Sequence, residues 1–184
     1  MVGRSLWDTE AVLTKASIRR LIGEALADVP DRMLRSVDLW AALAALPEYA
    51  AAKVVMAFNS MHTEPDTDGL HARLARDGKT LILPRIEPAG IVAVAAGGGT
   101  RRGQFGIVEP LGEPIDPATI DLVVVPGVAF TADGWRLGHG RAYYDRFLPG
   151  ATRAFTVGAC FTEQLVDRLP VDGHDVRLDL VLSC

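Results

Sequence analysis

Residues 121–148 combine the residue types of an anion-binding loop. In DLVVVPGVAFTADGWRLGHGRAYYDRFL an apolar strand precedes a long glycine-bearing loop, which leads into a helix predicted to begin near Ala142 or Tyr143. A helix start offers unpaired N–H groups and the positive end of a dipole. The loop adds mobile positive charge and glycines, which let the backbone approach a ligand closely. These residues are Arg136, Gly138, Gly140 and Arg141.

The chemistry predicted for this loop is phosphate binding, outside the common nucleotide motifs. Asp145 follows the loop, where its carboxylate could hold Mg²⁺ against phosphate oxygens. Residues 138–143, GHGRAY, carry Tyr143 where a dinucleotide fingerprint needs its third glycine. No GK[ST] occurs in the chain, so a Walker A loop is not predicted either. On these residues alone, a purely structural turn is the alternative.

Two cations near the N-terminus could face the same anion. Lys15 and Arg19 are four residues apart in a helical pattern, so they lie on one side of the helix and border its apolar stripe. Like charges at this spacing cost an isolated helix roughly a few tenths of a kcal/mol, which a bound anion would relieve. The alternative is a solvated helix face.

The apolar pattern predicts the elements that must position these residues. Apolar residues at three- and four-residue intervals predict a helix over residues 8–29, capped by Asp8 or Thr9 and stopped by Pro30. Further helical patterns cover residues 37–46 and 67–76. Apolar and β-branched runs predict strands at residues 53–58, 80–83, 91–96, 122–125, 154–158 and 178–182.

Helices that alternate with fully apolar strands predict an α/β fold. The expected architecture is a three-layer sandwich, with a mostly parallel central sheet covered by helices on both faces. Ligands of such sheets bind outside the carboxyl ends of the strands, so the loop after Val125 is the first place to look. At roughly 100 to 200 residues per domain, the 184 residues predict a single domain over residues 1–184.

Composition and charge exclude several classes of partner. Nineteen basic and 23 acidic residues give a net charge of −4, which predicts no binding to nucleic acid or to an anionic membrane. The chain shows neither a secretory h-region nor about 18 consecutive apolar residues, and a cytoplasmic location is therefore expected. Cys160 and Cys184 form no metal-ligand pattern and no disulfide framework, which fits a reducing compartment. Cys160 is expected in the core.

Several motifs in a fixed order are shared with one enzyme family. They are the pair Lys15 and Arg19, SMHTEPDT (60–67), GKTLILPR (78–85), GQFGIVEP (103–110) and, most strongly, VPGVAFTADGWRLGHGRAYYDRFL (125–148). GACFTEQL (158–165) and HDVRLDLVLS (174–183) close the series, which spans nearly the whole chain. In these motifs the sequence resembles the 5-formyltetrahydrofolate cyclo-ligases, also called methenyltetrahydrofolate synthetases.

The resemblance implies an ATP- and Mg²⁺-dependent ligase that converts 5-formyltetrahydrofolate to 5,10-methenyltetrahydrofolate. ATP would phosphorylate the formyl oxygen, N10 of the folate would attack the activated carbon, and ADP and phosphate would be released. Phosphoryl transfer depends mainly on positioning and on charge stabilisation, which cations and loop N–H groups provide. The implied partner is a reduced folate, and a monomer or weak homo-oligomer is expected.

The resemblance also implies roles for individual residues. Arg136 and Tyr143 would be catalytic. The ATP contacts would be Lys15, Arg19, Arg136, Leu137, Gly138, His139, Gly140, Arg141, Ala142, Tyr143 and Tyr144. Folate would contact Asn59, Glu64, His139, Gly140, Arg141, Ala142 and Tyr143, and the metal would be held by Asp145 and Asp175.

Structural alternatives accompany three of these assignments. Glu64 could be a solvated loop acid, and Asp175 could cap a turn near a strand. At least one of the adjoining Tyr143 and Tyr144 is expected to pack in the interior with its hydroxyl satisfied locally. His139 occupies a variable position of the family, and no proton transfer is assigned to it.

Two positions depart from the family pattern. Ala142 stands where a third glycine is usual, and Thr131 where an aspartate is usual. If position 142 needs a positive φ, alanine there costs on the order of 1 kcal/mol; if it is the first helical residue, alanine is harmless. Two other functions stay open: a nucleotide- or folate-binding homologue without turnover, and a different anion-substrate enzyme on the same scaffold.

Overall fold

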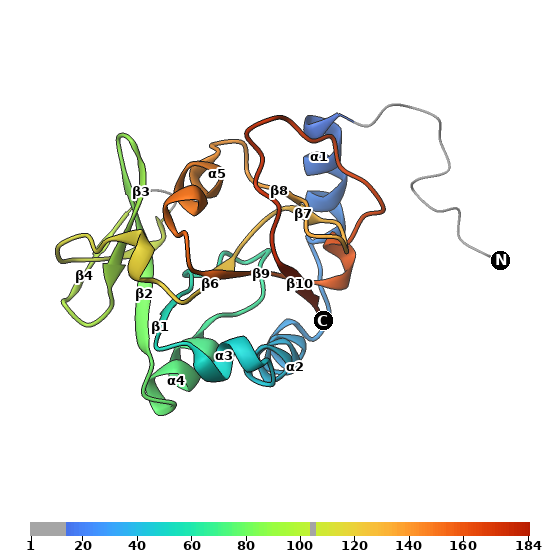
Figure 1. Ribbon diagram of the computed structural model, residues 1–184. Coiled ribbons are helices and arrows are strands. Elements are labelled where there is room, and N and C mark those ends of the chain that lie inside the picture. The colour runs from blue at the N-terminus through green and yellow to red at the C-terminus, as the bar shows by residue number, and fades with distance from the viewer. Residues whose placement is uncertain (1–13, 104–105) are drawn as a thin grey trace.

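A six-stranded sheet forms the centre of the molecule in the computed structural model, which describes residues 14–103 and 106–184 (Figure 1). The strand order is β10-β9-β6-β1-β2-β3. All neighbours are parallel except β2 and β3, which form an antiparallel hairpin. The bounds are β1 Val54–Met56, β2 Thr80–Glu87, β3 Gly90–Ala95, β6 Leu122–Val125, β9 Phe155–Cys160 and β10 Leu180–Ser183. The predicted mostly parallel sheet is confirmed.

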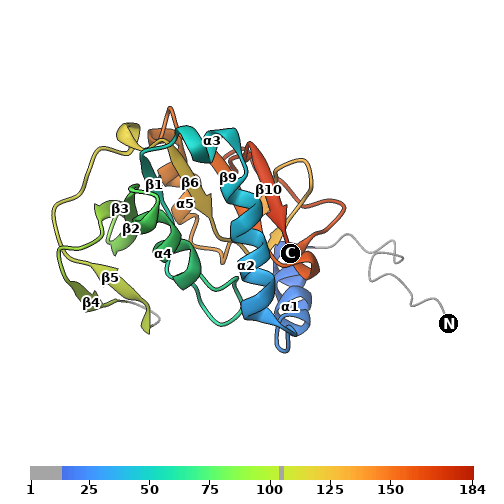
Figure 2. The same cartoon turned by 90° about the horizontal axis from the view of Figure 1, so that it is seen from below.

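Both faces of the sheet are buried because strand side chains alternate between them. In β6, Leu122 and Val124 pack with helices α2 (Arg32–Ala44), α3 (Pro47–Ala51) and α4 (Asp68–Arg76). The intervening Val123 and Val125 pack on the opposite face with α5 (Tyr143–Phe147). Figure 2 shows α2 and α4 together over one face, and Figure 1 shows α5 on the other. The predicted three-layer sandwich is confirmed.

Helix α1 (Lys15–Ala25) lies beside the sheet and is shorter than the predicted helix over residues 8–29. It begins at Lys15 because the hydroxyl of Thr14 accepts a hydrogen bond from the backbone N–H of Ser17, an N-cap contact. The expected caps Asp8 and Thr9 lie outside the described residues. The helix ends before residue 29, which precedes Pro30 and is disfavoured in a helical conformation. Its apolar face packs against residues 128–129, Leu137 and Phe161.

A small hairpin occupies part of the segment predicted as a long glycine-bearing loop. Strands β7 (Ala129–Phe130) and β8 (Arg136–Leu137) pair antiparallel immediately after β6. Thr131 is buried in their connection, where its hydroxyl accepts a hydrogen bond from the N–H of Trp135 at 3.0 Å. The departure at Thr131 therefore has a structural role in closing the hairpin. A second pair, β4 (Thr100–Arg102) and β5 (Val108–Pro110), projects beside the sheet.

Two further observations bear on the expectations from composition. Cys160 is buried, as predicted, and both cysteines are free thiols. Among the residues that the structure describes, no helix has the length and apolarity that crossing a bilayer would require.

Candidate active site

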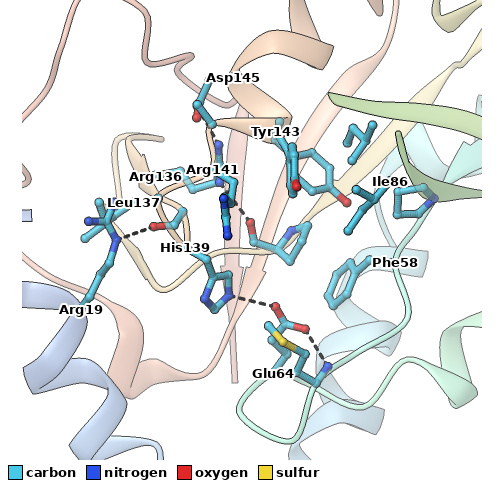
Figure 3. A pocket seen from close by; sticks show the side chains of 18 of the residues that line it. Arg19, Phe58, Glu64, Ile86, Arg136, Leu137, His139, Arg141, Tyr143 and Asp145 are labelled. Atoms are coloured by element: carbon cyan, nitrogen blue, oxygen red, sulfur yellow. Dashed lines mark hydrogen bonds and ion pairs between the residues drawn. The ribbon is translucent and has the colours of Figure 1, made fainter. Parts of the chain in front are cut away.

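A cavity of about 610 Å³ lies at the carboxyl ends of the central strands (Figure 3). Its walls come from α1, from the segment after β1, from the β2–β3 hairpin, and from residues 136–145 and 172–175. Every residue predicted from the sequence to form the site lines this one cavity. Parallel strands present their carboxyl ends at one edge, which explains why segments so distant in sequence meet there.

Arg136 is the buried cation of the site. It lies on β8 and is only 7% exposed. Its Nη2 donates a hydrogen bond to Asp145 Oδ1 at 2.7 Å, and its guanidinium carbon lies 5.6 Å from the ring centroid of Tyr144. Its Nε is buried and has no hydrogen-bond partner among the described residues. A buried N–H donor without a partner is costly, so this group is suited to donate a hydrogen bond to a ligand oxygen.

Arg19 joins α1 to the glycine-bearing loop. Its Nε donates a hydrogen bond to the carbonyl of Gly138 at 2.8 Å, as Figure 3 shows. Gly140 has a φ of +94° and lies close to the same guanidinium. Helix α5 has only five residues, so guanidinium and ammonium groups must supply most of the positive potential here, rather than a helix dipole.

Ala142 adopts the left-handed conformation, with φ 50° and ψ 32°, at the N-cap position of α5. The harmless alternative, in which Ala142 is the first helical residue, is therefore wrong. The strained alternative holds, because a Cβ in this region crowds the backbone.

Lys15 lies in the cavity wall between two carboxylates. Its Nζ is 2.6 Å from Asp175 and 2.8 Å from Asp172. Burial lowers the pKa of Lys15, but the hydrogen bonds to Asp172 and Asp175 outweigh burial and raise this pKa overall. For Asp175 the directions are reversed. Burial alone would raise its pKa, but the hydrogen bonds from the Asp172 N–H and from Lys15 outweigh burial, and the net effect is a lowered pKa. These contacts therefore favour the charged forms of Lys15 and Asp175.

The donors that could hold a metal ion are divided between two places. Asp172, His174 and Asp175 offer ligand atoms within 4.8 Å of one another. Carboxylate oxygens suit Mg²⁺, and the ammonium of Lys15 already lies where a cation is attracted. Asp145 is not a member of this group, and its Oδ1 accepts the hydrogen bond from Arg136. Asp175 also closes a turn, since its Oδ2 accepts from the N–H of Asp172.

Glu64 forms the acidic end of the cavity. It is only 4% exposed, so the alternative of a solvated loop acid is wrong. Its Oε2 accepts a hydrogen bond from the N–H of Met61 at 2.8 Å, and its Oε1 lies 3.6 Å from Nε2 of His139. Figure 3 shows this contact bridging the two sides of the cavity. Asn59 lies nearby, where its amide nitrogen donates to the carbonyl of Val108 at 2.6 Å.

Tyr144 differs from the expectation for a packed tyrosine. Its hydroxyl is buried and has no hydrogen-bond partner among residues 14–103 and 106–184. Burial, together with the nearby negative charge of Glu64, raises the pKa of Tyr144. The prediction of a locally satisfied hydroxyl is thus wrong for Tyr144. The neighbouring Tyr143 stacks with the guanidinium of Arg146, 5.7 Å from its ring centroid.

Most lining residues that the sequence did not predict are apolar. Pro126 directly follows strand β6 and Phe58 lies two residues after the end of β1, so the rule that ligands bind at strand ends could have found them. The others carry no comparable signal in the sequence: Met61, Pro84, Ile86, Ile91, Ile107, Glu109, Asp172 and His174.

Comparisons with known proteins agree with one another. The model of the 5-formyltetrahydrofolate cyclo-ligase family matches residues 12–183. A 5-formyltetrahydrofolate cyclo-ligase of Mus musculus is 27% identical over 169 residues, which are 83% of this chain and 83% of the mouse protein. One from Escherichia coli K12 is 32% identical over 147 residues, 74% of this chain and 81% of the bacterial protein.

A solved structure extends the likeness to three dimensions. The NMR structure of Aquifex aeolicus 5,10-methenyltetrahydrofolate synthetase is similar with a TM-score of 0.83 at 31% identity, covering 93% of this chain and 90% of that chain. The resemblance noted in the sequence is confirmed. Since the family model matches nearly the full length and the fold is shared, the chain belongs to the 5-formyltetrahydrofolate cyclo-ligase family, whose enzymes are ATP-dependent ligases.

Proposed function

We propose that this protein catalyses the ATP-dependent cyclisation of 5-formyltetrahydrofolate to 5,10-methenyltetrahydrofolate. The observation that carries the proposal is a single cavity with a cationic side and a buried carboxylate opposite. Membership of the family and the names of the mouse and Aquifex aeolicus relatives support the same reaction.

The acidic end suits a reduced pterin. A pterin is a flat ring system that carries several N–H groups at its edge. Glu64 can accept hydrogen bonds from such groups, and its burial strengthens them because the local dielectric is low. The apolar side chains of Phe58, Ile86 and Ile91 line the same cavity and can cover the faces of the ring.

The cationic end suits the phosphates of ATP. The formyl oxygen would attack the γ-phosphorus, and the bond to the bridging oxygen of ADP would break. N10 would then attack the formyl carbon, the proton on N10 would pass to the leaving phosphate or to water, and the carbon–oxygen bond would break to release phosphate. Arg136, Arg19 and the backbone of residues 138–144 are suited to stabilise the negative charge of the transferred group. Tyr143 would contact the reacting groups as the second catalytic residue.

The proposal includes a magnesium ion. Asp175 and Asp172 fit a hard cation, provided that Lys15 turns from them toward a phosphate. Asp145 is proposed as a further ligand. When bound, Mg²⁺ would neutralise phosphate charge and polarise the γ-phosphoryl group.

We also propose a cytoplasmic location, and a monomer or weak homo-oligomer as the assembly.

One assay tests the function. Purified protein is mixed with Mg-ATP and 5-formyltetrahydrofolate, and the methenyl product is followed by its near-ultraviolet absorbance. Product that requires both ATP and folate supports the proposal, and omission of either substrate is the control. Binding of ATP or folate without product would indicate a non-catalytic homologue. Binding of neither would indicate a different anion-substrate enzyme.

A further inference from the structure

We infer that Arg32 is a positioning residue that fixes Glu64 for folate binding. The inference rests on the proposed function, in which Glu64 accepts hydrogen bonds from the pterin. Arg32 is the first residue of α2, and it does not line the cavity that Glu64 lines. Its guanidinium instead reaches the loop on which Glu64 lies.

The contacts of Arg32 span both ends of the turn formed by residues 61–64. Its Nε donates a hydrogen bond to the carbonyl of Glu64 at 2.8 Å, and its Nη2 donates to the carbonyl of Met61 at 3.0 Å. The same turn is closed internally, because the N–H of Glu64 donates to the carbonyl of Met61 at 3.0 Å. The N–H of Met61 in turn holds the Glu64 carboxylate. One guanidinium thereby fixes the peptide groups that aim the carboxylate.

Two more residues of α2 hold the same loop, on the same side of the helix. Ser36 Oγ accepts a hydrogen bond from the N–H of Asp66 at 2.8 Å, and Trp40 Nε1 donates to the carbonyl of Asp66 at 2.6 Å. Arg32, Ser36 and Trp40 are spaced by four residues, so they form one stripe along the helix. All three side chains contact Asp66, Arg32 through its Nη1 at 3.3 Å from Asp66 Oδ2, and of the three only Arg32 also bonds Glu64 itself.

The N-terminus of α2 lacks the side-chain cap that would stabilise a helix. Asp31, immediately before Arg32, has a φ of 51° and makes no side-chain capping hydrogen bond to α2. A non-glycine residue in this conformation persists only where the surrounding structure holds it. The four contacts of Arg32 to residues 60–66 supply that support, which joins the strained helix start to the loop of the site.

Arg32→Gln and Arg32→Lys test the inference. A guanidinium is a planar fork that reaches two carbonyls at once, whereas an ammonium is a point charge and glutamine has only one donor group. We expect either variant to raise the KM for 5-formyltetrahydrofolate about tenfold, the effect of losing one charge-assisted hydrogen bond. The KM for ATP should stay within about twofold, because the cations of the other side are untouched.

Arg35→Gln is the matched control. Arg35 lies three residues later on α2, is similarly buried, and binds both carboxylate oxygens of Glu163 at 2.7 and 2.6 Å. Its loss should lower stability without changing the KM for folate. Equal increases in the folate KM for Arg32→Gln and Arg35→Gln, or equal increases in both KM values for Arg32→Gln, would reduce Arg32 to a general structural role and overturn the inference.

A double-mutant cycle separates positioning from direct contact. Because Arg32 acts through Glu64, adding Arg32→Gln to Glu64→Gln should raise the folate KM by less than about twofold further. A full additional tenfold increase would overturn the inference. Folate binding to each variant is measured by calorimetry alongside turnover, so a wild-type protein that binds folate without turnover refutes the proposed function while still testing Arg32. A wild-type protein that does not bind folate would refute both.

Discussion

At the scale of single residues, Ala142 places a methyl group where the backbone is left-handed, with φ 50°. This conformation costs an L-residue about 1 to 2 kcal/mol, whereas glycine adopts it freely. Glycine also increases the conformational entropy of the unfolded chain, which offsets part of this gain. The net expectation is that Ala142→Gly raises the free energy of unfolding by roughly 1 kcal/mol. Urea denaturation measures the change. Ala132→Gly, at an exposed turn residue with negative φ, is the control and should lower stability slightly.

Lys15 on α1 and Arg136 on β8 provide a test of the proposed ATP-binding side of the cavity. Lys15→Ala and Arg136→Ala should each raise the apparent KM for ATP, because both remove positive charge from the phosphates. The increase should be about tenfold for Arg136, which is buried, and smaller for Lys15, whose charge is shared with two carboxylates. Steady-state kinetics with varied ATP measure both. Lys53→Ala, on an exposed residue, is the control, and unchanged ATP kinetics in both test variants would exclude this nucleotide site.

Most of the charged residues of the site and its glycines were open to prediction, whereas most of its apolar wall was not. Arg136 and Glu64 lie in motifs whose residue types carry chemistry, so the sequence alone could nominate them. Ile86 and Ile91 are ordinary strand residues, and they face the cavity only because β2 and β3 pair in one register, Ile86 opposite Ile91. That register depends on contacts between strands, which a single sequence does not display.

At the scale of elements, Asp121 links the starts of two parallel strands. Its Oδ2 accepts hydrogen bonds from the N–H groups of Lys53 and Val54, both at 2.9 Å, immediately before and at the start of β1. Its Oδ1 accepts from Arg153 at 2.7 Å. The backbone hydrogen bond from Val54 is the main cause that lowers the pKa of Asp121, and the second from Lys53 and the charge of Arg153 act in the same direction, against burial.

This lowered pKa predicts a loss of stability in acid. A carboxyl group whose pKa is lower in the folded state contributes its stability above the unfolded value, near 3.8, and loses it as the pH falls through the folded value. Asp121→Asn should therefore lower the free energy of unfolding at pH 7 by about 1 kcal/mol, and by less at pH 3. Urea titrations at both pH values measure this, with Asp28→Asn on an exposed turn as the control. A difference that does not shrink at pH 3 would contradict the role of the charge.

The elements that were predicted well are those with a continuous local signal. The strand over residues 122–125 is correct at both ends, because all four residues are apolar and fully buried. The β7–β8 hairpin was missed, since two-residue strands leave no periodicity to detect. The first residue of α1, Lys15, was not predicted because the cap contact of Thr14 decides that boundary, and the predicted start at residue 8 lies outside the described residues.

At the scale of the whole molecule, the cavity gathers α1, the middle of the chain and residues 172–175 around one ligand space. A ligand there contacts parts from both ends of the chain, so it should stabilise all of them together. Mg-ATP at about 100 times its Kd should raise the free energy of unfolding by about 2.7 kcal/mol. For a chain of this size that is a rise in Tm of roughly 5 to 10 °C.

Scanning calorimetry with and without Mg-ATP tests this coupling and the prediction of a single domain at once. We expect one cooperative transition that moves as a whole, because strands from residues 54–95 and from residues 122–183 belong to one continuous sheet, joined at its centre where β1 pairs with β6. Lys15→Ala at the same nucleotide concentration should show a smaller shift, since occupancy falls as Kd rises. A second transition that stays in place when nucleotide is added would mean that part of the chain unfolds independently of the site.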